Sequence, residues 1–92
     1  MYETVRSVIK PKWSLEILAA LAVESPQNFS RIEKQFDTSS DVITKRLRLL
    51  EKYGLIDRTE HTAKNVQYKI TERGEEVLKR LETIDKLLEN GR

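Results

Sequence analysis

Residues 39–74 decide the fold, and they read SSDVITKRLRLLEKYGLIDRTEHTAKNVQYKITERG. The first part predicts an amphipathic helix over about 40–53, with Ser39 as its N-cap. Gly54 is placed to end that helix, because glycine readily adopts the left-handed conformation that follows many helix C-termini. The remainder predicts a two-stranded hairpin and the start of another helix.

The hairpin is predicted from apolar residues that flank a polar segment. Strands are expected at 55–58 and 66–70, the second because apolar and polar residues alternate there as in a half-buried strand. Residues 59–65 are polar and are expected to form a loop. Thr71 is then expected to cap a long helix that reaches about residue 90.

Drawn at about 100° per residue, the predicted helix over 40–53 has two apolar strips and one polar side. The apolar strips consist of Ile43, Leu47 and Leu50, and of Val42, Leu49 and Tyr53. The polar side consists of Asp41, Thr44, Lys45, Arg48 and Lys52. Arg46 falls between the strips, so we expect its stem to pack and its guanidinium to pair with an acid.

Formal charge is unevenly distributed, although the total is only +2. Residues 39–71 hold seven basic and four acidic residues, a net of +3. Residues 1–38 hold five of each, and residues 72–92 hold five basic and six acidic residues. Such a surplus fits a surface that faces phosphate, and it also fits an ordinary solvated surface.

The N-terminal part predicts further helices. A short helix over 2–10 precedes Pro11, and an amphipathic helix over about 13–24 is stopped by Pro26. Residues 27–29 can form a small strand.

A brief helix over about 31–36 is expected next, burying Ile32 and Phe36. Ser30 and Glu33 fit a capping box at its start, although Ser30 and Arg31 can equally hold a phosphate there. The aromatic residues Trp13, Phe29 and Tyr68 are expected to pack in the core rather than to stack on bases.

Composition excludes several functions. Ninety-two residues predict one domain, 1–92, and the absence of cysteine excludes disulfides, thiolate metal sites and cysteine nucleophiles. His61 alone cannot form a histidine metal cluster and is expected to be an exposed loop residue. Membrane-spanning and signal-peptide patterns are absent. We expect a soluble, cytoplasmic protein that is not an enzyme and has no cofactor.

In this order, the elements resemble a winged helix-turn-helix domain, and the motifs resemble HxlR-type regulators, with PadR- and MarR-type regulators as relatives. The motifs are KW at 12–13, IL at 17–18, NFSRIEK at 28–34, ITKRLRLLEKYGLIDR at 43–58 and VQYKITERGEEVL at 66–78. The resemblance implies a mainly α fold (α+β) with a small β-hairpin wing and a long C-terminal dimerisation helix. HxlR-type regulators often carry a sensing cysteine near the N-terminus, and its absence here means that this switching chemistry is not transferable.

The resemblance also implies which residues bind DNA. Residues 40–53 would be a recognition helix in the major groove, and 55–70 a wing on the flanking backbone or minor groove. The expected DNA-binding residues are Ser39, Ser40, Asp41, Thr44, Lys45, Arg48, Lys52, Arg58, Lys64 and Asn65. Lys45 and Arg48 can reach guanine or phosphate, whereas Asp41 is better explained as stabilising the helix N-terminus.

The last helix carries a heptad seam formed by Val77, Leu81, Ile84 and Leu88. We expect residues 72–90 to pair with the same helix of a second subunit, and 1–71 to form the DNA-binding core. The alternative is that this helix folds back on its own domain. A two-fold dimer would place its recognition helices about 34 Å apart on a palindromic operator.

Together these observations predict a homodimeric regulator of transcription that binds double-stranded DNA sequence-specifically. The alternative is a winged-helix protein-interaction module without sequence-specific DNA binding. The operator, the direction of regulation and the existence of a small-molecule effector stay open.

Overall fold

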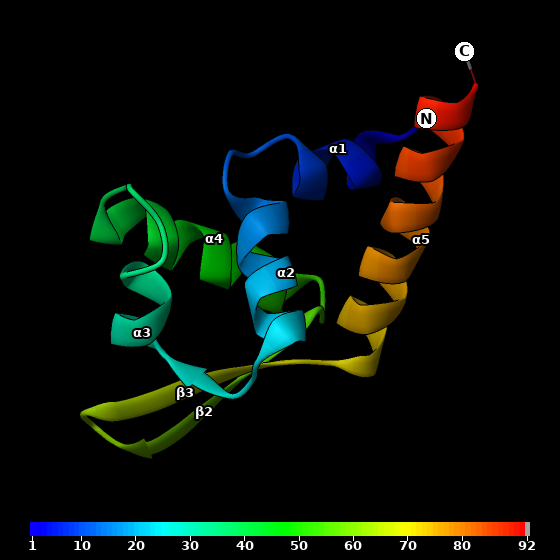
Figure 1. Cartoon of the computed structure of the whole chain (residues 1–92). Coiled ribbons are helices and arrows are strands. Elements are labelled where there is room, and N and C mark those ends of the chain that lie inside the picture. The colour runs from blue at the N-terminus through cyan, green and yellow to red at the C-terminus, as the bar shows by residue number, and fades with distance from the viewer. Residues whose placement is uncertain (92) are drawn as a thin grey trace.

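The structure is a computed structural model, and it describes residues 1–91. Its elements are α1 (Glu3–Ile9), α2 (Ser14–Val23), β1 (Gln27–Asn28), α3 (Phe29–Glu33), α4 (Ser40–Lys52), β2 (Ile56–Thr62), β3 (Asn65–Ile70) and α5 (Glu72–Asn90). Figure 1 shows α2, α3 and α4 on one side of the sheet, while the β2–β3 hairpin projects away from them and α5 stands at the opposite end. The predicted mainly α fold with a small β wing and a long C-terminal helix is therefore confirmed.

The core lies between the helices and the sheet. Its buried apolar residues are Val8, Ile17, Leu18, Leu21, Ile32, Ile43, Leu47, Leu50, Leu55, Ile56 and Ile70. Three of these form the expected apolar strip of α4. The aromatic rings of Trp13, Phe29 and Tyr68 pack against the same core, as the sequence predicted.

The sheet has three antiparallel strands in the order β1-β3-β2. The small strand expected near residue 27 is thus present and pairs with β3. The loop predicted over 59–65 is wrong for most of its length, because β2 continues to Thr62 and β3 begins at Asn65. The outer part of β2 is exposed, so its residues lack the apolar alternation that reveals a half-buried strand.

The capping box predicted at Ser30 is also wrong. The N-cap of α3 is Asn28, whose side-chain oxygen accepts a hydrogen bond from the Arg31 amide at 2.8 Å. The carboxylate of Glu33 accepts instead from the Ser40 hydroxyl. Asparagine is as good an N-cap as serine, and β1 ends at Asn28, so the helix begins earlier than expected.

The ends of α4 are as predicted. The hydroxyl of Ser39 accepts a hydrogen bond from the Val42 amide at 3.3 Å, and Gly54 follows the helix with φ of 73°. Arg46 departs from expectation, because its Nε donates to the Lys12 carbonyl at 2.6 Å rather than to an acid. The turn before α2 offers this carbonyl within reach of the α4 side chain.

Hydrogen bonds made by Thr71 hold the start of α5 against the turn that follows α4. The Thr71 hydroxyl accepts from the Gly74 amide at 3.0 Å, the expected N-cap, and donates to the Gly54 carbonyl at 2.6 Å. Thr71 also donates its amide to the Leu55 carbonyl at 3.0 Å. One residue therefore caps α5 and fastens it to the turn that ends α4.

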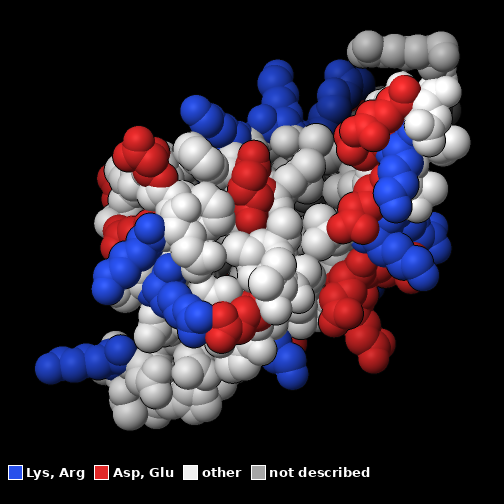
Figure 2. Space-filling view, viewed as in Figure 1, with Lys and Arg blue, Asp and Glu red and all other residues white. Residues whose placement is uncertain are grey.

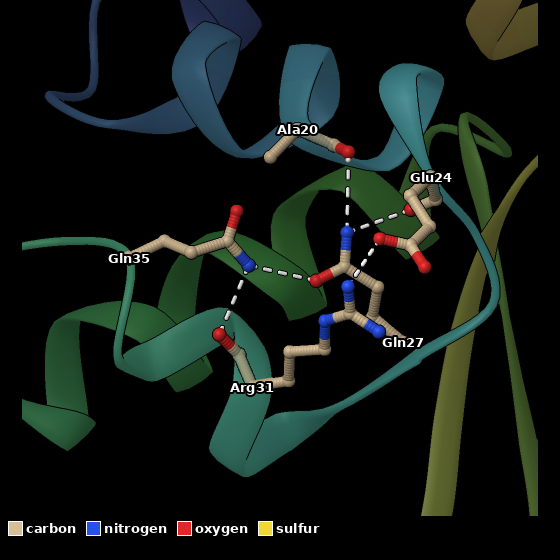
Figure 3. A network of polar contacts seen from close by, with 5 residues as sticks. All are labelled: Ala20, Glu24, Gln27, Arg31 and Gln35. Carbon is tan, nitrogen blue, oxygen red and sulfur yellow. Dashed lines mark hydrogen bonds and ion pairs between the residues drawn. The ribbon is translucent and has the colours of Figure 1, made fainter.

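Buried Gln27 links α2, β1 and α3 (Figure 3). Its Nε2 donates to the carbonyls of Ala20, at 3.2 Å, and Glu24, at 2.6 Å, and its Oε1 accepts from Gln35 Nε2 at 2.7 Å. Gln35 also donates to the Arg31 carbonyl, and the Arg31 guanidinium pairs with the Glu24 carboxylate. Because Gln27 pairs with Tyr68 across β1 and β3, the helices and the hairpin are joined as one unit.

Within residues 1–91, no helix is both long and apolar enough to cross a membrane. The same residues contain no group of three or more histidine, aspartate or glutamate side chains placed to hold a metal ion.

Candidate nucleic-acid interface

The polar side of α4 faces outward, away from the core. Asp41, Lys45 and Arg48 are exposed, and Thr44 is half-buried. Within the described chain, neither Lys45 nor Arg48 has an ion-pair partner. Their cationic groups are therefore available to a ligand, as a surface that meets phosphates or base edges requires.

Three other expected residues of this helix are engaged within the protein. Ser39 caps α4, and the Ser40 hydroxyl donates to Glu33. The ammonium of Lys52 lies 5.7 Å from the centre of the Tyr53 ring, a cation–π contact at the end of the helix. Among the expected residues of α4, Asp41, Lys45 and Arg48 are thus exposed without such a contact in the described chain, while Thr44 is half-buried.

The wing, defined as the β2–β3 hairpin over 56–70, carries the remaining expected residues. Arg58 lies on β2, where its guanidinium is 3.3 Å from the Glu60 carboxylate. Lys64 and Asn65 are exposed at the tip, and the Lys64 amide donates to the Thr62 hydroxyl at 3.3 Å. The structure therefore separates Arg58, near the base of the wing, from the two residues at its tip.

A pocket of about 360 Å³ lies where α4 meets the wing. It is lined by Thr44, Leu47, Arg48, Glu51, Arg58 and Tyr68. Interaction with the Tyr68 side chain raises the pKa of the Arg58 guanidinium, and the nearby Glu60 carboxylate raises this pKa further. The predicted residues Arg48 and Arg58, from separate elements, are brought together here.

Tyr68 is a polar member of this site that the sequence assigned to packing alone. Arg58 and Tyr68 are directly opposite each other in the β2–β3 pairing, so they share one face of the sheet. A loop over residues 59–65, as the sequence predicts, would leave Tyr68 without this partner. The alternation along 66–70 predicts only that Tyr68 lies on an inward face.

Charge elsewhere on the surface is mixed. Figure 2 shows acidic and basic side chains interspersed along α5, with no uniform field of one sign on the face in view. The surplus of positive formal charge falls within residues 39–71, which form α4 and the wing and have a net charge of +3.

Comparison with solved structures finds the same fold in proteins described as possible or established regulators of transcription. A possible HxlR family transcriptional factor from Thermoplasma volcanium is 27% identical, with a TM-score of 0.73 over 94% of this chain and 83% of that one. A protein from Enterococcus faecalis assigned to the MarR family of transcriptional regulators is 26% identical, with a TM-score of 0.80 over 91% and 78%. The transcriptional regulator YodB from B. subtilis, in its reduced form, shares the fold at 23% identity, with a TM-score of 0.76 over 92% and 85%.

A comparison with curated proteins found no match. The family comparison matches residues 8–91, which include every helix and strand from α2 onward. On the strength of that match, the chain belongs to the HxlR-like helix-turn-helix family.

Proposed function

We propose that this protein is a homodimeric regulator of transcription that binds double-stranded DNA sequence-specifically. Membership of the HxlR-like family and the likeness to regulators support a DNA-binding role. The observation that carries the proposal is the polar side of α4, where Lys45 and Arg48 project without partners in residues 1–91. An α-helix of this kind fits the major groove of DNA.

In the proposed complex, α4 enters the major groove and the wing lies along the flanking backbone and minor groove. Lys45, which ends in a compact cation, can reach guanine or phosphate. Asp41 serves chiefly the helix dipole at the start of α4. Ser39 and Ser40 at the helix start, Lys52 at its end, and Lys64 and Asn65 at the wing tip complete the proposed contact surface.

The proposed dimer uses the seam along α5. Val77 and Leu81 are half-buried against their own domain, whereas Ile84 and Leu88 are 50% and 71% exposed. Packing of α5 on its own domain thus accounts for Val77 and Leu81, and it leaves Ile84 and Leu88 uncovered. Exposed apolar side chains at heptad spacing favour pairing with a second copy of the same helix.

The N-terminal helix adds to this surface, which the sequence did not predict. An apolar groove of about 350 Å³ runs between α1 and α5, with Val5 and Ile9 on one side and Leu81 and Ile84 on the other. A partner helix seated there would cover both elements. Two-fold symmetry then predicts a palindromic operator, with the two α4 helices about 34 Å apart.

The test begins with selection of bound duplexes from a random pool, which gives the site, its symmetry and the half-site spacing. Affinity for the selected duplex is then measured at several salt concentrations for the wild type and for Lys45→Ala plus Arg48→Ala. We expect a palindromic site, a strong dependence on salt and a large loss of affinity in the double variant. Lys79→Ala, an exposed charge change on α5, is the control and should bind as the wild type does.

Failure to enrich any duplex, or binding that ignores salt and the double substitution, would contradict the proposal. Recovery of a protein partner without nucleic acid would then favour the interaction-module alternative.

A further inference from the structure

The pocket between α4 and the wing brings together side chains that can bind the oxygens of one oxyanion. Thr44, Arg48 and Glu51 recur at steps of four and three, so they lie along one side of α4. Arg58 and Tyr68 face them from paired positions on β2 and β3. Leu47, only 1% exposed, closes the inner end. The lining therefore combines two arginines, a threonine and a tyrosine with one acidic residue, Glu51, and one apolar residue, Leu47.

We infer that this pocket is the seat of a single DNA backbone phosphate, an inference that rests on the DNA-binding function proposed above. The seat is defined by Arg48, Arg58, Thr44 and Tyr68. Guanidinium groups suit phosphate because their planar N–H donors match its oxygens in pairs. The two hydroxyls can donate to the same oxygens, so each polar group of the seat has a role toward one phosphate.

The position of the seat follows from the shape of duplex DNA. A helix in the major groove and a hairpin tip in the adjacent minor groove are separated by one sugar–phosphate strand. That strand must cross the space between α4 and the wing, which is where the pocket lies. A phosphate at this point fixes the depth and orientation of the helix in the groove, because backbone contacts set the register of a protein on DNA.

Two acidic groups oppose the phosphate. Glu51 lines the pocket, and Glu60 already pairs with Arg58. The side chains of Arg58 and Glu60 are 39% and 51% exposed, and a pair this exposed is weak. A phosphate can therefore replace Glu60 as the partner of Arg58, while Glu51 lowers the affinity below what the two arginines alone would give.

The assignment changes the expected role of Arg48. As a member of the seat, Arg48 contacts the DNA backbone and contributes equally to the affinity for every DNA sequence. Lys45 is then the long cationic side chain left free for base readout. The assignment also gives the Tyr68 hydroxyl a binding role in addition to the packing of its ring.

The test uses the full-length protein and two fluorescent duplexes, one selected from the random pool and one of mixed sequence. The variants are Tyr68→Phe, Arg48→Ala, Arg58→Ala, the double arginine variant and Glu51→Gln. Lys79→Ala is the control, since Lys79 is an exposed cation on α5, outside both α4 and the wing. Thermal melting of each variant establishes that it is folded.

Tyr68→Phe should weaken binding of the proposed dimer to both duplexes by about a hundredfold, because it removes one hydrogen bond to an ionised phosphate in each subunit. The slope of log affinity against log salt should fall by about 1.8 in the double arginine variant, the value for one phosphate in each subunit, rather than by about 3.6, the value for two in each subunit. Glu51→Gln should bind more tightly than the wild type, and Lys79→Ala should retain the affinity of the wild type.

A second measurement locates the phosphate. Single uncharged methylphosphonate linkages are placed in turn along the selected duplex. One linkage in each half-site should weaken binding by the wild type and leave binding by the double arginine variant unaffected. If the wild type binds, three results would each overturn the seat and leave the DNA-binding function standing: unchanged affinity of Tyr68→Phe, a fall in slope of about 3.6, or the absence of such a linkage. Absence of wild-type binding to either duplex would overturn the function itself.

Discussion

Gly74 packs so closely against Leu55 that a β-carbon at position 74 would overlap the Leu55 carbonyl oxygen. The same β-carbon would come within 2.7 Å of Ile70 Cγ1. This contact lies in the first turn of α5, next to the Thr71 cap, and it brings the helix axis against the turn after α4. The absence of a side chain at Gly74 is thus what allows α5 to start where it does.

Gly74→Ala should lower the free energy of unfolding by about 3 kcal/mol, since backbone atoms cannot move aside as a flexible side chain can. Urea titration followed by circular dichroism measures the change. Glu75→Ala, an exposed substitution in the same turn, is the control and should cost less than about 1 kcal/mol. Equal stability of Gly74→Ala and the wild type would contradict the close approach.

Gln27→Leu should destabilise the protein by about 2 kcal/mol, because it leaves the Glu24 carbonyl after α2 without its donor and removes the hydrogen bonds to Ala20 and Gln35. Chemical denaturation again gives the value. Gln35→Ala removes an exposed member of the same network and should cost about half as much. A Gln27→Leu protein that matches the wild type would show that these hydrogen bonds contribute no net stability.

Ser39→Ala should cost about 1 kcal/mol through loss of the α4 N-cap. Ser39→Asn keeps a capping oxygen and should restore stability. Comparing DNA affinity of the two variants separates the structural role of Ser39 from a direct contact. If the asparagine variant is stable but binds DNA poorly, Ser39 touches DNA itself.

Ile84→Lys with Leu88→Lys should convert the proposed dimer to a monomer, because it places charges in the apolar seam of α5. Sedimentation velocity should show a mass of about twice 10.8 kDa for the wild type and about 10.8 kDa for the variant. Thr83→Lys adds a charge at an exposed position of α5 outside the hollow that Leu81, Ile84 and Leu88 line, and this control should stay dimeric. A monomeric wild type would remove the basis for a palindromic operator.

Local signals made α4 predictable from the sequence. Its boundaries depend on Ser39 and Gly54, and its buried side follows from the spacing of Ile43, Leu47 and Leu50. These features involve neighbours within a few residues, so one sequence is enough to recognise them.

Predictions from the sequence fail where contacts between residues far apart in the chain determine the structure. The outer part of β2 is a strand because it hydrogen bonds to β3, and its exposed polar side chains do not show this. Asn28 replaced Ser30 as the cap because the pairing of β1 with β3 fixes where the chain turns into α3. The meeting of Arg48 with Arg58 and Tyr68 likewise depends on strand register and on how α4 packs against the wing.

The short strand β1 has a consequence for how the protein would tolerate changes in its DNA. Because β1 joins β3 and leads directly into α3, the helix-turn-helix segment and the wing cannot swing independently. In the proposed complex the distance between their two contact points is therefore fixed within each half-site. Inserting one base pair between those points should abolish recognition, whereas an insertion between half-sites is opposed only by the stiffness of the α5 pairing.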